Sequence, residues 1–121
     1  MTEKEIFVQQ MRQRTKKFAV EVINFCNSLQ STKATSVITY QLIKSATSTG
    51  ANYRAACRAR SKNEFFSKVC IVVEEIDESE YWLELIKETK LSNEEKILND
   101  LIIEANELTK IMSKAKNSTY S

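Results

Sequence analysis

Acidic side chains between residues 74 and 80 form the first group in the sequence that suggests chemistry. Glu74 and Glu78 are four residues apart, so on a helix they share a face where two carboxylates could bind a metal ion or act as an acid–base pair. The absence of histidine excludes Ser-His, Cys-His and Glu-x-x-His sites. Charge pairing explains the cluster better, because Lys44, in a segment without acidic residues, would face Asp77 and Glu78 from a neighbouring helix. We therefore expect no catalytic residue, metal or cofactor.

A second group, suited to binding phosphate, contains Arg54, Arg58, Arg60 and Lys62. Residues 31–60 contain basic but no acidic side chains, whereas acidic side chains outnumber basic ones in residues 61–90. Arginine presents a planar fork that fits phosphate oxygens, so the cluster indicates nucleic-acid binding. The alternative is a solvated end that pairs with acidic groups of a neighbouring subunit. No RNA-binding motif or aromatic stacking platform accompanies the cluster, so base-specific recognition is not predicted.

Tyr81 and Trp82 are the third group, and they lie within the most apolar helical segment. Aromatic side chains at helical spacing usually belong to a core or a subunit interface rather than to a ligand pocket. The apolar residues around Trp82 are spread over more than one narrow stripe, so one bundle core would leave some of them uncovered. We expect self-association through Tyr81 and Trp82.

Composition restricts the fold that must position these groups. The chain has 121 residues, no proline and one glycine, which excludes a β-sandwich or barrel with many turns. Its 42% hydrophobic content and net charge of +2 fit one core-forming domain over residues 1–121. No apolar run approaches the roughly 20 residues that span a bilayer. The charged N-terminus lacks a signal-peptide core, and the three cysteines show no C-x-x-C spacing, so we expect a cytoplasmic protein with buried thiols and no membrane partner.

Hydrophobic periodicity predicts four helices. The third stripe is the clearest, stepping by four and three residues from Phe65 to Ile86, and the fourth repeats it from Leu98 to Met112. The first runs from Phe7 to Leu29 and is interrupted by Arg14. The weaker second stripe, from Ile38 to Ala56, is rich in small residues and contains Gly50, which favours close approach of a neighbouring helix.

The predicted connections make these helices antiparallel neighbours. Capping-box patterns begin at Ser61 and Ser92, and a Ser- and Thr-rich loop is expected over residues 28–36. Short connections predict an all-α, up-down-up-down four-helix bundle. That topology gathers the second connection, the start of the first helix and the end of the fourth at one end of the bundle. The basic side chains expected there form what we call the basic pole: Arg12, Arg54, Arg58, Arg60, Lys62, Lys114 and Lys116. The opposite end would collect Glu84, Glu88, Glu94 and Glu95.

Two blocks carry a family resemblance. Residues 41–65 (QLIKSATSTGANYRAACRARSKNEF) and 73–85 (VEEIDESEYWLEL) resemble the bacterial four helix bundle protein family, first noticed as reading frames in intervening sequences of 23S ribosomal RNA genes. The resemblance implies an antiparallel four-helix bundle, assembly into a barrel-like homopentamer, and no known enzymatic activity. A related branch comprises accessory proteins of diversity-generating retroelements, which are basic pentamers that bind a reverse transcriptase and nucleic acid. This chain departs from that branch in its modest charge and acidic third helix.

We disfavour a carboxylate metalloenzyme at Glu74 and Glu78. Three other functional hypotheses follow from the sequence. The first is a non-enzymatic, self-assembling protein that binds RNA or DNA phosphate through the basic pole. The second is a protein–protein scaffold that uses its helix-three aromatics. The third is an accessory subunit of a retroelement reverse transcriptase, without catalysis of its own.

Overall fold

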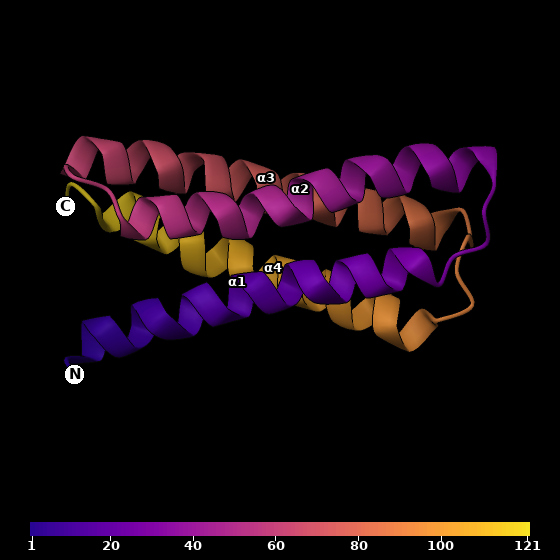
Figure 1. Ribbon diagram of the computed structural model, residues 1–121, viewed down its shortest axis with the longest axis horizontal. Helices are drawn as coiled ribbons and strands as arrows, with labels where there is room; N and C mark the ends of the chain where they lie inside the picture. The colour runs from indigo at the N-terminus through magenta and orange to yellow at the C-terminus, as the bar shows by residue number, and fades with distance from the viewer.

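The computed structural model describes residues 1–121 as four long helices joined by short connections. The helices are α1 (Glu3–Asn27), α2 (Lys33–Cys57), α3 (Lys62–Glu88) and α4 (Glu95–Ser118). Each helix runs antiparallel to the next, so the start of α1, the end of α2, the start of α3 and the end of α4 lie together at the left of Figure 1. The predicted up-down-up-down four-helix bundle is confirmed. None of the helices is long and apolar enough to cross a membrane.

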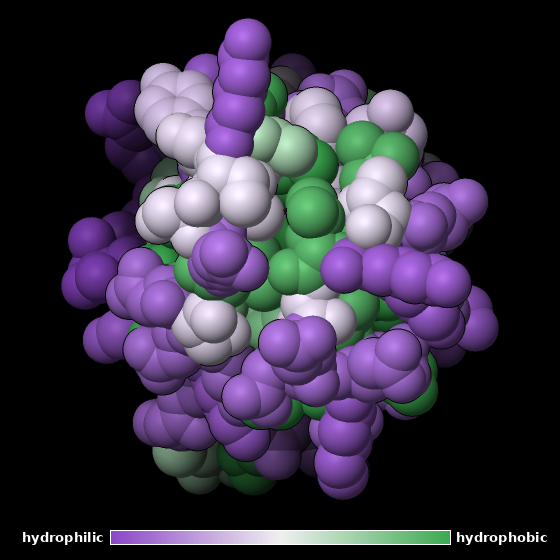
Figure 2. Space-filling view, turned by 90° about the vertical axis from the view of Figure 1, so that its right-hand side faces the viewer, coloured by the Kyte–Doolittle hydropathy of each residue, from purple (hydrophilic) through white to green (hydrophobic).

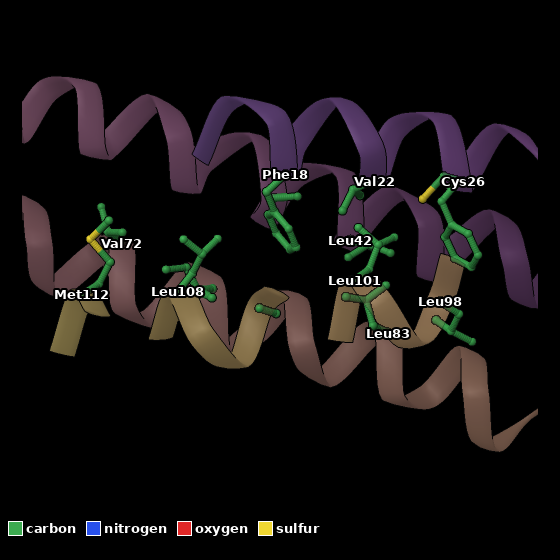
Figure 3. Close-up of a cluster of buried hydrophobic side chains, with 14 of the residues drawn as sticks. Phe18, Val22, Cys26, Leu42, Val72, Leu83, Leu98, Leu101, Leu108 and Met112 are labelled. Carbon is green, nitrogen blue, oxygen red and sulfur yellow. The ribbon is translucent and has the colours of Figure 1, made fainter. Parts of the chain in front are cut away.

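The core follows the predicted stripes. Figure 3 shows Phe18, Leu42, Leu83 and Leu101, one from each helix, pointing into the same interior. Every buried residue of α3 and α4 belongs to its predicted stripe. The stripes fail at one end of the bundle, where Phe7 is 42% exposed and Phe65 is only partly buried. In α1 the buried position beside Arg14 is Thr15, whose hydroxyl donates to the Met11 carbonyl at 2.9 Å.

Small residues bring α2 close to both of its neighbours. The Ser45 and Ser79 hydroxyls lie 2.8 Å apart where α2 crosses α3, and each side chain also bonds to its own helix backbone. On the other side of α2, a Cβ added to Gly50 would lie 3.4 Å from the Thr15 carbonyl oxygen of α1. The close approach inferred from Gly50 and its small neighbours is thus present.

The helix ends agree in part with one predicted capping box and depart from the other. The Ser61 hydroxyl accepts from the Glu64 amide at 3.1 Å and caps α3 as predicted, but the Glu64 side chain pairs with Arg60 and does not bond back to the Ser61 amide. The prediction at Ser92 was wrong, because α4 begins at Glu95 without a side-chain cap. Lys90 adopts a left-handed conformation with φ 56°, and the Leu91 amide donates back to the Ile86 carbonyl at 3.2 Å. This turn delays the start of α4 past the predicted position.

The loop between α1 and α2 is shorter than expected. Helix α2 begins at Lys33 rather than after Ser36, because Thr32 and Thr35 form a reciprocal capping box. The Thr32 hydroxyl accepts from the Thr35 amide at 3.1 Å, and the Thr35 hydroxyl accepts from the Thr32 amide at 2.8 Å. Thr35 thus performs the role that the usual Ser-x-x-Glu pattern assigns to glutamate.

Candidate nucleic-acid interface

The bundle brings the basic pole together at the end that holds both chain termini. Arg54 lies in the last turn of α2, Arg58 and Arg60 lie in the following connection, and Lys62 begins α3. Lys114 and Lys116 lie near the end of α4, at the same end in Figure 1. Every arginine of the chain is in this half of the bundle. Arg12 lies in the first half of α1, so all four helices contribute to this end, as the topology predicted.

Within this half of the bundle, a shallow groove between α1 and α2 is lined by basic side chains from both helices. We call it the α1/α2 groove: it has a volume of about 360 Å³ and is lined by Arg12, Lys16 and Arg54, with no carboxylate. Its floor consists of small side chains, including Gly50 and Ala51, because the two helices approach closely there. The sequence did not single out Lys16, although its spacing of four residues from Arg12 is the signal that would have found it.

The charge of Arg12 also affects buried Tyr53 and partly buried Cys57, near the end of α2. Burial raises the pKa of Tyr53 above its usual range, and the positive charge of Arg12 opposes that rise. Burial likewise raises the pKa of Cys57, with Tyr53, Arg12 and Arg58 opposing it. Neither Arg12, Arg54 nor Arg58 forms an ion pair within the protein.

The other members of the basic pole have different surroundings. Arg60 is 91% exposed in its side chain, and its Nε lies 3.8 Å from Glu64 Oε2. The Lys62 Nζ lies 5.9 Å from the centre of the Tyr120 ring. Lys116 is partly buried in the last turn of α4 and lines neither the α1/α2 groove nor the opening that contains Lys62 and Lys114. The seven predicted residues thus divide into separate surfaces rather than forming one patch.

The predicted contrast between the two ends is weaker than expected. Glu3, Glu5 and Glu64 lie at the basic end. The opposite end carries Glu84, Glu88, Glu94 and Glu95 but also the lysines Lys33, Lys87, Lys90 and Lys96. Figure 2 views that end and shows hydrophilic side chains surrounding an apolar centre. Both ends mix charges, so the feature that distinguishes the basic pole is its arginines.

The acidic face of α3 forms no metal site in this arrangement. Glu74 and Glu78 are exposed, and no three acidic or cysteine side chains are grouped to hold a metal ion. The expected pairing of Lys44 with Glu74, Asp77 and Glu78 is absent, since none of these residues forms an ion pair. Instead, burial raises the pKa of Glu75, aided by Glu78 and Glu74, and the charge of Lys44 opposes the rise. The Ser45–Ser79 contact explains this, because Glu75 is one turn from Ser79 on the side that faces α2.

The two aromatic residues proposed for the subunit interface differ in exposure. Tyr81 is 54% exposed, whereas Trp82 is partly buried and packs against the core. Their rings meet edge-on with centres 5.0 Å apart, and the Trp82 indole Nε1 donates to Glu78 at 3.1 Å. Tyr81 is therefore the accessible member of the pair.

The cysteines also differ from one another. Cys26 is buried in the core, and burial raises the pKa of its thiol to about 11. Cys57 and Cys70 are only partly buried, so the expectation of three buried thiols holds for one of them.

Comparison with known proteins identifies the bundle. Residues 8–114 match the family described as 23S rRNA-intervening sequence protein. The chain belongs to this family. The residues that match the 23S rRNA-intervening sequence protein family include the whole lining of the α1/α2 groove and both blocks of the sequence resemblance. A solved structure agrees: a protein with unknown function from the S23 ribosomal protein family of Bacteroides thetaiotaomicron VPI-5482 is 30% identical, with a TM-score of 0.80, over 88% of this chain and 98% of that one. No curated protein matches the chain.

Proposed function

We propose that this member of the 23S rRNA-intervening sequence protein family is a non-enzymatic protein that binds the phosphate backbone of RNA in the α1/α2 groove. The supporting observation is that Arg12, Lys16 and Arg54, from two antiparallel helices, line one groove without an acidic neighbour. Arg58 extends this surface toward the α2–α3 connection. Arg60, Lys62, Lys114 and Lys116 are at the same end and add to the attraction for a polyanion.

The composition of the groove defines the kind of binding. Guanidinium groups form two parallel hydrogen bonds to phosphate oxygens, and lysine adds a point charge. No aromatic side chain lines the groove, so it offers nothing on which bases could stack. We therefore expect binding that depends on phosphate and on salt, with little discrimination between sequences.

The test is fluorescence anisotropy of a labelled, structured RNA across a salt series. The double variant Arg12→Ala and Arg54→Ala should weaken binding by tenfold or more for every RNA sequence. It should also reduce the slope of log affinity against log salt by about 1.4–1.8, since each of the two lost phosphate contacts contributes about 0.7–0.9.

The matched control uses two adjacent lysines of α1. Lys16 lines the groove, whereas Lys17 lies outside it and pairs with Glu21 at 3.6 Å. Lys16→Glu should weaken RNA binding strongly, and Lys17→Glu should weaken it only slightly. Equal effects of the two variants, or no measurable binding by the unmutated protein in low salt, would refute the groove assignment. The second result would favour a protein–protein scaffold.

We also propose that the bundle assembles into a homopentamer, with Tyr81 at the subunit interface. The supporting observation is that the Tyr81 ring is exposed on α3, where it meets the partly buried Trp82 edge-on. Light scattering during size-exclusion chromatography should give a mass five times the 13.9 kDa of one chain. Tyr81→Glu should lower that mass, whereas Tyr40→Glu, which changes a similarly exposed tyrosine of α2, should not. A monomer mass for the unmutated protein would exclude the pentamer.

A further inference from the structure

A second open groove, which shares no lining residue with the α1/α2 groove, lies at the basic end of the molecule. We call it the end groove: it has a volume of about 890 Å³ and is lined by residues of all four helices. Most of its lining is apolar, including Phe7, Val8, Phe65, Ile111 and Ala115. Its charged lining residues are Lys4, Lys62 and Lys114, and no carboxylate lines it. An apolar floor with a cationic rim therefore faces solvent.

The divergence of α1 from α4 creates this groove. The two helices are fastened at Arg14, which bonds to Glu104 and Glu107. Toward the N-terminus from that point, α1 separates from α4, as Figure 1 shows. Phe7 and Val8 thus face a space that the core does not fill, which leaves Phe7 42% exposed. On the opposite wall, Ile111 and Ala115 of α4 are only partly buried.

We propose that the end groove binds a single long-chain anion, such as a fatty acid of ten to twelve carbons, with its carboxylate among the three lysines. The volume is within the range of about 300–1,000 Å³ that is usual for small-molecule sites, which are mostly apolar with a few polar groups that orient the ligand. The lysine ammonium groups complement one negative head group, and the absence of carboxylates leaves an anion without repulsion at the rim.

The length of the groove selects this occupant over a helix of a partner protein. Its α4 wall extends from Ile111 to Thr119, about 12 Å at roughly 1.5 Å per residue. An extended alkyl chain of roughly ten to twelve carbons has the same length, given carbon–carbon bonds of about 1.5 Å. A partner helix would gain contact over only about two turns, and isolated helices shorter than about 12–15 residues are marginal in water.

Calorimetric titration with octanoate, decanoate and dodecanoate below their micelle concentrations tests the proposal. Each addition of two methylene groups should tighten binding by roughly tenfold up to dodecanoate, because every methylene leaves water. Hexadecanoate should gain little more, since its extra carbons extend beyond the groove. Dodecyltrimethylammonium, with the same chain and a positive head, should bind at least tenfold more weakly. Affinity that ignores chain length or head-group charge would overturn the proposal.

Variants locate the site and separate it from RNA binding. Ala115→Phe adds an uncharged ring inside the groove and should weaken dodecanoate binding by tenfold or more, while RNA affinity stays unchanged. Lys114→Glu should also weaken dodecanoate binding, whereas the matched Lys110→Glu, at an exposed position on α4 outside the groove, should not. The lysine pair keeps the test valid if Ala115→Phe fails to fold.

Other occupants would be visible in the same measurements. Dodecanoate that fails to bind an assembled oligomer but binds a dissociated Tyr81→Glu monomer would show that a second copy of the chain covers the groove, and would overturn the proposal. An acidic amphipathic peptide that binds while dodecanoate does not would overturn it in favour of a protein partner. If the unmutated protein binds dodecanoate but no RNA, the result would count only against the proposed function.

Discussion

Arg14 of α1 and Glu104 of α4 form a two-bond ion pair that joins helices whose other contacts are few. The Arg14 Nε lies 2.7 Å from Glu104 Oε2, and Nη2 lies 2.6 Å from Glu104 Oε1. The same Nη2 also donates to Glu107 at 2.6 Å. The hydrogen bond to Glu104 raises the pKa of Arg14 above its usual range, although partial burial opposes this. Because α1 packs mainly on α2, this contact sets where α1 leaves the bundle and where the end groove begins.

Replacing Arg14 should therefore destabilise the protein more than removal of an ordinary surface charge. We expect Arg14→Ala to lower the free energy of unfolding by about 1–2 kcal/mol, because it leaves partly buried Glu104 without its partner. Lysine cannot form the two parallel bonds, so Arg14→Lys should recover less than half of the loss. Urea unfolding measures both values. Lys17→Ala, which removes an exposed pair within α1, should stay within about 0.5 kcal/mol, and an equal loss there would contradict the prediction.

Substitution by glycine should change the stability of the protein in opposite directions at Lys90 and at nearby Lys87. Lys90 has φ 56°, a conformation that costs a residue with a side chain roughly 1 kcal/mol and that glycine adopts freely. Lys90→Gly should stabilise the protein by about 0.5–1 kcal/mol, after allowance for the greater flexibility of the unfolded chain. Lys87→Gly, in the last turn of α3, should destabilise it by about 1 kcal/mol or less. Thermal unfolding would refute the assignment if both variants shifted the midpoint in the same direction.

Glu75 should give the stability of the protein a characteristic pH dependence. Its pKa is raised first by burial and then by Glu78 and Glu74, so the folded protein holds this proton more tightly than the unfolded chain. Ionised Glu75 therefore costs stability at neutral pH, and the cost disappears as the pH falls through the raised pKa toward the unfolded value of about 4.3. Glu75→Gln should stabilise the protein by up to about 0.5 kcal/mol at pH 7.

The decisive measurement is the difference between Glu75→Gln and the unmutated protein at two pH values. Urea unfolding should show an advantage at pH 7 that shrinks toward zero at about pH 3, where residue 75 is largely neutral in both proteins, folded and unfolded. An advantage that grows on acidification would contradict the raised pKa.

The core of the bundle was predictable because its signal is repeated many times along each helix. The stripe from Val69 to Ile86 is a period of three and four residues sustained over several turns, and a repeated pattern outweighs any single exception. The polar residue Ser79 was correctly placed in that stripe because its neighbours fixed the period. The stripe ends were less predictable, since burial of Phe7 depends on how far α1 diverges from α4 rather than on its own sequence.

The candidate site was predictable only in outline. Topology correctly gathered Arg12 and Arg54 at one end, but the groove they share depends on the rotation of each helix, which also brings in Lys16. Long-range pairs were harder still. Arg14 and Glu104 are 90 residues apart, and nothing in either local sequence marks the other as its partner. Lys44 shows the reverse error, because correct neighbouring helices did not imply an ion pair once Ser45 and Ser79 had set the local contact.

Gly50 tests whether the close approach of α1 and α2 requires glycine. Its missing Cβ would lie 3.4 Å from the Thr15 carbonyl oxygen, which is an ordinary van der Waals distance. Gly50→Ala should therefore fit, and it should stabilise the protein by about 0.5–1 kcal/mol because alanine loses less entropy in a helix interior. Gly50→Leu should instead push α1 away, destabilise the bundle by more than about 1 kcal/mol and weaken RNA binding by disturbing the groove floor. Urea unfolding and RNA anisotropy on the two variants separate these effects, and a destabilising alanine would show that the helices are closer than van der Waals contact allows.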